Sequence, residues 1–288
     1  MANVCGRTLL VLTLVLTLVV TAAAACSAPV SAPVIGSAPI STTEKGAPRP
    51  CALKPGPSNT GATGTLEPAG SNIVLSDGQH LENAMVSGGL TVEGDDVVVD
   101  NVSIAGNVLV LGRRATLTHV SARGIAISGA SKVSVSYAQI RDSAEDGIHV
   151  TSDRGPVSDV VLAYNYVHAP DVPYDAHYDG TQVRGAERLV ISCSTYDLGV
   201  WKPQYNAAIY LENANGGVRD VRIADNWING GGYALMLDGD RVLLDGNTFG
   251  DDAHWGLCEA KASFTRGQAP RMRANVDARG RALTPCGA

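Results

Sequence analysis

The chain has 288 residues, of which 32 are glycine and only two are phenylalanine, and its net charge is −6. An interior with so few large rings favours thin, repeated β layers built from small branched side chains over a helical bundle. The mildly acidic balance argues against a nucleic-acid-binding protein, because such a protein needs a basic face.

Residues 1–25 have the features of an export signal. Arg7 supplies a positive charge near the start, an uncharged apolar run follows from Thr8 to Val20, and Ala23-Ala24-Ala25 directly precede Cys26. The run is short for a membrane span and typical of a signal peptide. Cys26 follows the small residues as in bacterial lipoprotein signals, although Ala23 stands where leucine is usual. Two outcomes stay open, lipidation of Cys26 and plain cleavage. Both predict an exported protein, either secreted or lipid-anchored in the bacterial cell envelope.

Residues 26–68 are predicted to form a tether. Ser-Ala-Pro recurs there, and further Pro and Gly follow at residues 55–57. Proline removes backbone donors and favours extended chain, so this composition does not build a core.

Four cysteines stand outside the signal and Cys26. An even number in an exported chain favours disulfides, and three full pairings are possible; the alternative is that some are free buried thiols. The four are Cys51, Cys193, Cys258 and Cys286.

Two short motifs alternate along residues 69–257. The first places a branched apolar residue three positions after Gly or Ala, and the second has the form V-x-V-x-x-N-x-I. Each recurs seven times at variable spacing, which indicates fixed coils with loops inserted at one corner. The first motif starts at Gly89, Asn107, Gly124, Gly147, Gly180, Ala208 and Ala234, and the second at Val97, Ala115, Val133, Val160, Leu189, Val221 and Val242.

The alternation predicts an all-β solenoid of about seven coils. Apolar and polar residues alternate within each motif, so one face points into the coil and the other outward. Stacked coils pair strand on strand in parallel. A β-propeller is the structural rival, but its blades need longer antiparallel units. Residues 258–288 are assigned to a C-terminal tail or cap.

Asparagine occupies one register of the second motif in three coils. Side-chain amides stacked in such a column bond from coil to coil, whereas isolated turn asparagines merely tolerate strained backbone. Three asparagines at one register favour a ladder of hydrogen-bonded side-chain amides. They are Asn165, Asn226 and Asn247.

The longest insertions, residues 168–179 and 196–207, both precede a first-motif strand, so they should form a wall beside its outward face. Aligned by register, that face carries one column with His149, Gln182 and Tyr210 and a second with Arg184 and Glu212. Asp146 and Asp179 stand just upstream in equivalent positions, and His177 and Tyr174 overhang them. Planar donors and acceptors beside aromatic rings suit a sugar site.

Each of these residues also has a plainer interpretation. Arg184 with Glu212 can be a stabilising cross-strand pair. Asp146 and Asp179 can simply close turns. Lys202 can be a solvated charge. Trp201 and Tyr205 can stack on a sugar or pin their loop.

The sequence resembles the pectate-lyase-like superfamily of right-handed parallel β-helices, and more closely a bacterial, largely actinobacterial, group of secreted β-helix proteins. The segments that carry the resemblance are LTVEGDDVVVDNVSI, HYDGTQV, DNWINGGGYALML and LLDGNTFGDDAHWG, within residues 70–257. Residues 174–179 are also similar to the Asp-Pro-His-Asp stretch of mannuronan epimerases, with Ala176 in place of proline and an extra tyrosine. The resemblance implies a single-stranded right-handed parallel β-helix that acts on or binds a polysaccharide.

If the protein is an enzyme, lyase or epimerase chemistry on a uronate polysaccharide fits these groups best. His177 would take the proton beside the carboxylate, Asp179 would orient His177, Arg184 or Lys202 would neutralise the carboxylate, and Tyr174 or Tyr210 would protonate the leaving oxygen. The substrate-binding set is His149, Gln182, Glu212, Trp201 and Tyr205.

Three further hypotheses accompany this one. Asp146 and Asp179 offer two ligands to calcium, too few by themselves for a site. A glycoside hydrolase would use a carboxylate pair from Asp146, Asp179 and Glu212. A non-catalytic surface protein would bind glycan or simply present its β-helix. In each case we expect a monomer with a polysaccharide ligand, no nucleic-acid partner, and membrane contact only through lipid on Cys26.

Overall fold

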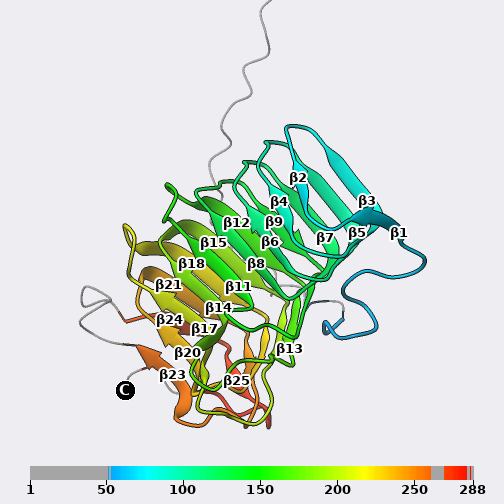
Figure 1. The fold of residues 1–288 in the computed structure, drawn as a ribbon. Helices are drawn as coiled ribbons and strands as arrows, with labels where there is room; N and C mark the ends of the chain where they lie inside the picture. The colour runs from blue at the N-terminus through cyan, green and yellow to red at the C-terminus, as the bar shows by residue number, and fades with distance from the viewer. Residues whose placement is uncertain (1–50, 52, 261–268, 284–285, 287–288) are drawn as a thin grey trace, which may run out of the picture. The chain divides into compact units, whose positions relative to one another are not determined.

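The computed structural model describes residues 51, 53–260, 269–283 and 286, and these contain strands and turns but no helix. The signal sequence, Cys26 and the tether up to residue 50 lie outside the described residues. Within the described part no helix is long and apolar enough to cross a membrane. Figure 1 shows successive strands stacked side by side along one axis, as predicted for a right-handed parallel β-helix.

One sheet has nine strands, one from each coil, and all its pairs are parallel. Seven of them coincide with the seven predicted first-motif segments, and β2 and β23 add one coil at each end. The sequence assigned residue 258 onward to a tail or cap, but β23 continues the coils into that region. The strands are β2 (Ile73–Leu75), β4 (Leu90–Val92), β6 (Asn107–Val110), β8 (Gly124–Ser128), β11 (Ile148–Thr151), β14 (Tyr178–Arg184), β17 (Tyr205–Glu212), β20 (Tyr233–Leu237) and β23 (Gly256–Ala260).

The second sheet has sixteen strands and divides at β7, which pairs with both β9 and β10. Early coils contribute one strand each, and later coils contribute two strands separated by a bend. The early strands are β1 (Glu67–Gly70), β3 (His80–Val86), β5 (Val98–Ile104) and β7 (Thr116–Ala122). On one side of the bend lie β9 (Ser134–Ser136), β12 (Ser158–Ala163), β15 (Ala186–Ser192), β18 (Val218–Ala224), β21 (Asp240–Asp245) and β24 (Arg271–Arg273). On the other lie β10 (Gln139–Ile140), β13 (Tyr166–His168), β16 (Thr195–Asp197), β19 (Trp227–Asn229), β22 (Thr248–Phe249) and β25 (Val276–Asp277).

The bend is held by the predicted asparagine ladder. Asn226 Oδ1 accepts from the amide of Ser194 at 2.9 Å, and Asn226 Nδ2 donates to Asn247 Oδ1 at 3.0 Å; Asn275 extends the column one coil further. These side chains are buried, so each bond satisfies a backbone group that water cannot reach. The ladder starts at Asn165, whose Oδ1 accepts from the amide of Ala138, the residue at this register in the first coil with a divided strand; the two coils before it carry Val102 and Val120 there.

The interior is filled by the inward half of each alternating strand. Valine, isoleucine and leucine from successive coils lie over one another with almost no exposed surface, as Val108, Ile125 and Ile148 do. Because parallel strands are about 4.8 Å apart, residues at one register also form columns on the outside. The outward columns position the candidate site.

Residues 53–66, which the sequence placed in the tether, lie along the coils as a strap. Gly61 donates to the carbonyl of Tyr137, and Thr63 exchanges hydrogen bonds with the side chain of Asn101. The Cys51–Cys193 disulfide ties the start of this segment to the bend, and Cys258–Cys286 closes the last coil. Together the two disulfides are one of the three full pairings that were possible for the four cysteines. Backbone pairing with turn groups holds the strap, which composition alone does not reveal.

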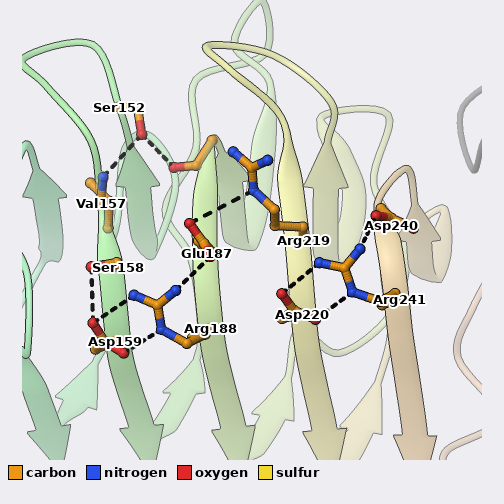
Figure 2. Close-up of polar contacts among 11 residues, drawn as sticks. Ser152, Val157, Ser158, Asp159, Glu187, Arg188, Arg219, Asp220, Asp240 and Arg241 are labelled. Atoms are coloured by element: carbon orange, nitrogen blue, oxygen red, sulfur yellow. Dashed lines mark hydrogen bonds and ion pairs between the residues drawn. The ribbon is translucent and has the colours of Figure 1, made fainter.

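A second turn column carries charges of alternating sign. Arg188 pairs with Asp159 and Arg241 with Asp220, each at 2.6 Å from Nε to a carboxylate oxygen, as Figure 2 shows. Asp159, Arg188, Asp220 and Arg241 all have left-handed backbone, with φ between 54° and 57°. The fold therefore sets these charges one above another, where opposite signs attract.

Candidate functional site

The site forms at the corner where the long loops enter the nine-stranded sheet. The loop before β14 carries His177, and the loop before β17 carries Trp201 and Lys202. These two loops pack together, because Gln204 donates to the carbonyl of Val172 and follows it one coil later. The predicted wall beside the strand face is therefore present.

Two aspartates stand in one column at this corner, on neighbouring coils. The amide of Asp179 donates to Asp146 Oδ1 at 2.9 Å, so the carboxylate of one coil fixes the backbone of the next. Asp179 Oδ1 accepts from the amide of Ala207 and from Asn206 Nδ2, both at 2.9 Å. One carboxylate oxygen of each aspartate therefore serves to hold a turn, which agrees with the plainer interpretation of these two residues.

Each aspartate also faces a histidine. His149 Nδ1 lies 3.4 Å from Asp146 Oδ2, and His177 Nδ1 lies 3.7 Å from Asp179 Oδ2. When the facing aspartate is ionised it favours the tautomer with the proton on Nδ1, which leaves Nε2 as the basic nitrogen. His149 Nε2 is buried and has no hydrogen-bond partner among the described residues, whereas the side chain of His177 is 59% exposed. Of the two rings, His177 is therefore the one that a ligand can reach for proton transfer.

Burial governs the charge of Asp179. Its side chain is fully buried, and this raises the pKa of the carboxyl well above its ordinary value, with the negative charge of Asp146 acting in the same direction. The hydrogen bonds from Asn206 and Ala207 oppose the shift. This carboxyl is therefore easier to protonate than an ordinary aspartate, and the two hydrogen bonds to Oδ1 favour its ionised form.

Gln182 and Tyr210 continue the surface beside the aspartates. Gln182 Nε2 donates to Asp179 Oδ2 at 3.4 Å, and Tyr210 is the register partner of Gln182 on the next coil. Partial burial raises the pKa of the Tyr210 hydroxyl, and the charges of Glu212 and Asp179 raise it further. Tyr210 therefore keeps its proton and can act as a donor.

Arg184 and Glu212 occupy the second predicted column. Arg184 Nε lies 2.9 Å from Glu212 Oε2, and the two residues are register partners. The cross-strand pair that the plainer interpretation described is therefore present. A substrate carboxylate would have to share Arg184 with Glu212.

Four further site residues predicted in the loops differ in how deeply they are buried. The ring of Tyr205 is 2% exposed, and its hydroxyl donates to the carbonyl of Pro170, so it holds the loops rather than facing a ligand. Trp201 Nε1 donates to the carbonyl of Tyr205, which also pins the loop. The ammonium of Lys202 lies 5.4 Å from the Tyr205 ring centroid, and Tyr174 is 81% exposed. None of these four is placed beside the two aspartates by a hydrogen bond or ion pair in the described part of the chain.

A pocket of about 340 Å³ opens beside the Asp146–His149 pair. Its lining includes Asn107, Gly124, Arg123 and Glu145 as well as the pair itself. Arg123 was not identified from the sequence, because it precedes a first-motif glycine and so falls outside both aligned columns. The feature of the sequence that could have identified Arg123 is its position directly before Gly124, at the corner where the loops cluster. It brings a cation into the pocket.

Asp146, His177 and Asp179 offer ligand atoms within 4.8 Å of one another. Two carboxylates and one imidazole do not fit calcium, which takes six to eight oxygens. Oδ1 of Asp179 already accepts two hydrogen bonds. Mixed nitrogen and oxygen ligands of this kind suit a transition metal better. The hydrogen bonds and ion pairs already account for this arrangement without a metal.

Comparisons with known proteins report the fold alone. No protein-family model matches the sequence, and a search of curated proteins finds no match. Among solved structures, an alginate lyase from a Paenibacillus species has a TM-score of 0.54 at 15% identity, covering 72% of this chain and 87% of that one. The A-module of a mannuronan C-5 epimerase from Azotobacter vinelandii gives 0.41 at 12% identity, covering 71% and 73%. The chain is thus similar in fold to parallel β-helix proteins.

Proposed function

We propose that the protein is an exported enzyme that moves protons on the acidic sugars of a polysaccharide, as a lyase or an epimerase. The observation that carries the proposal is the pair of Asp–His contacts, Asp146–His149 and Asp179–His177, on adjacent coils beside a pocket. An exposed imidazole held at Nδ1 by an aspartate suits a reaction in which a proton is removed, and the neighbouring Tyr210 hydroxyl can deliver one. Solved structures of similar fold include an alginate lyase, which is consistent with this substrate class.

In the first step His177 Nε2 removes the proton from the carbon beside the sugar carboxylate. The electron pair moves toward that carboxylate, so a cation is needed to stabilise the enolate. Arg123 in the pocket and Arg184 on the strand face supply positive charge on the two sides of the Asp–His pairs. Asp179 holds the ring of His177 from the buried side and stabilises the imidazolium that forms.

The second step decides the product. In β-elimination the enolate collapses, the bond to the neighbouring glycosidic oxygen breaks, and Tyr210 gives its proton to that oxygen. In epimerisation a second donor returns a proton to the same carbon from the opposite face; this role is assigned to the Tyr210 hydroxyl, which keeps its proton, because Nε2 of His149 is buried. In both cases every proton removed by one side chain is balanced by one delivered from another, and no redox partner is needed.

A glycoside hydrolase is less well supported by this geometry. It needs two carboxyl groups that reach the glycosidic bond from opposite sides of a groove. Asp179 is fully buried, and Asp146 lies on the adjacent coil of the same column. Glu212 is paired with Arg184.

The test is to incubate the protein without its signal with alginate, polygalacturonate, glucuronan and a neutral glucan in deuterated buffer. A lyase gives an unsaturated sugar that absorbs in the ultraviolet, and an epimerase incorporates deuterium without shortening the chain. New reducing ends without absorbance would identify a hydrolase and contradict the proposal. Binding without any product would identify a non-catalytic glycan-binding protein.

We also propose that the protein works outside the cytoplasm. The signal sequence supports this, and so do the Cys51–Cys193 and Cys258–Cys286 disulfides, because such bonds persist in oxidising compartments. Lipidation of Cys26 would retain it at the membrane surface. Labelling cells with a fatty-acid analogue distinguishes the anchored form, which Cys26→Ser abolishes, from a secreted form that carries no label.

A further inference from the structure

Four aromatic rings gather at the same corner as the Asp–His pairs, two coils further along. His254 stacks on Trp201 with ring centroids 3.9 Å apart, and Trp255 leans against Trp201 at 5.8 Å and Tyr233 at 5.6 Å. The rings come from three successive coils, before β17, at the start of β20 and before β23. We call this set the aromatic platform: Trp201, Tyr233, His254 and Trp255.

The backbone holds the platform rigidly. The amide of Trp255 donates to the carbonyl of Gly232 at 2.6 Å, and that of His254 to the carbonyl of Gly231 at 3.0 Å. A Cβ at Gly232 would lie 2.3 Å from the Trp255 ring, so the ring rests directly on glycine backbone. The orientation of Trp255 is therefore set before any ligand arrives, which lowers the entropic cost of binding.

Trp255 is nevertheless 52% exposed. A tryptophan that served only to cover the end of the hydrophobic interior would be largely buried, since covering the interior is the source of its stabilisation. Here the surrounding rings support one side of Trp255 and leave much of its surface to solvent. A rigid, exposed aromatic surface of this kind suits stacking on the apolar face of a sugar ring.

The platform is aligned with the proposed site by strand register. Asp179 pairs with Ala207, and Ala207 with Tyr233, so Tyr233 lies in the aspartate column two coils beyond Asp179. Two coil steps correspond to about 10 Å. A polysaccharide lying along the helix axis with one sugar at the Asp–His pairs would bring a later sugar over Trp255. On the opposite side the same column passes the pocket lined by Asn107 and Gly124.

We infer that the aromatic platform is a substrate subsite in which Trp255 stacks on a pyranose ring of the same polysaccharide chain. This inference rests on the proposed function and adds the direction in which the chain lies, along the coils from the pocket toward β23. It assigns Trp255 to binding and not to catalysis.

The experiment uses affinity electrophoresis in gels cast with alginate, polygalacturonate, glucuronan or a neutral glucan. Trp255→Leu keeps an apolar side chain but removes the flat ring. Trp227→Leu is the matched control, because Trp227 lies on the sixteen-stranded sheet under the ammonium of Lys54. His177→Ala keeps the platform and removes the proposed base. Melting temperatures confirm that each variant is folded.

We expect one polymer to retard the wild type, His177→Ala and Trp227→Leu, and Trp255→Leu to bind that polymer about tenfold more weakly or worse. Equal retardation of Trp255→Leu and the wild type would overturn the platform and leave the proposed function standing. Turnover lost in His177→Ala with undiminished binding, and a higher KM together with weaker binding in Trp255→Leu, support both. If no polymer retards the wild type, both proposals fail.

Discussion

The buried carboxylate of Asp179 lies 3.7 Å from Nδ1 of the exposed His177 ring, one coil from the equivalent contact between Asp146 and His149. The register of the β-helix creates this repetition, since the two aspartates occupy one column. The stacked fold thus repeats one Asp–His contact on adjacent coils, with the ring of His177 exposed and Nε2 of His149 buried.

Replacing His177 should stop turnover without unfolding the protein. We expect His177→Ala to lower kcat by about a hundredfold or more, the usual contribution of a positioned acid or base, and His149→Ala to lower it less, because Nε2 of His149 is buried. Initial rates on the polymer identified by the panel provide the measurement. His80→Ala is the control, since His80 lies in β3 at the far end of the coils. Full activity in His177→Ala would remove the proposed base.

Asp179→Asn should separate stability from function. Because burial raises the pKa of Asp179, folding favours its protonated form, and the wild type loses stability as pH rises above the ordinary carboxyl value of 3.8 toward the higher folded value. Asparagine mimics the protonated carboxyl, so the variant should melt at the same or a higher temperature at neutral pH and vary less with pH. Turnover should nevertheless fall.

Melting curves across the pH range check this, with Asp171→Asn, an exposed position, as the control. Marked destabilisation of Asp179→Asn at neutral pH would mean that the folded protein needs the ionised carboxylate. A bound cation would then have to be considered, and melting with added zinc and with chelator would reveal it.

The ion pair between Asp159 and Arg188 should give the opposite pH dependence of stability. A hydrogen bond from Arg188 lowers the pKa of Asp159 to about 2, so this carboxylate stabilises the fold above 3.8 and loses its effect as pH falls toward 2. Asp159→Asn suits the left-handed backbone and removes the charge. The melting-temperature difference from the wild type should be complete at neutral pH and vanish in acid. High salt should reduce it, because the pair is exposed; a difference independent of both would exclude the ion pair as its cause.

The asparagine ladder should be the costliest of these features to break. Asn226→Ala removes the partner of the Ser194 amide and of the Ile191 carbonyl, both at 2.9 Å and buried. Each buried group left unsatisfied costs about 1–3 kcal/mol. Asn107→Ala, at an exposed position, should change stability by less than about 0.5 kcal/mol. Urea unfolding of both variants compares them, and equal midpoints would contradict a structural ladder.

The repeats in the sequence were sufficient to predict the coils, because alternation and glycine spacing report directly on which side chains face inward. They missed the first and last coils. In β23 the segment GLCEA is half-buried throughout and shows no alternation to detect. The strap at residues 53–66 was missed for a different reason: its contacts are backbone hydrogen bonds to distant turns, such as Gly61 to Tyr137.

The candidate site was predictable where it follows register and not where it depends on loops. Asp146, Asp179, His149 and Gln182 could be aligned by counting along the strands. The burial of Tyr205 and the entry of Arg123 into the pocket depend on how loops of unequal length fold back, which no periodicity encodes. Disulfide pairing was likewise open, since it requires distances between coils.

The strap also constrains the order in which the molecule can be completed. Residues 53–66 are synthesised before any coil, yet their partners lie on coils made later, and Cys51 must wait for a cysteine 142 positions downstream. Contacts of such long sequence separation form slowly. The strap is therefore the last of the described segments to be fastened, and a chain that lacks the later coils would leave it without its partners. Maturation should show a late kinetic phase that depends on oxidant and disappears in Cys51→Ser.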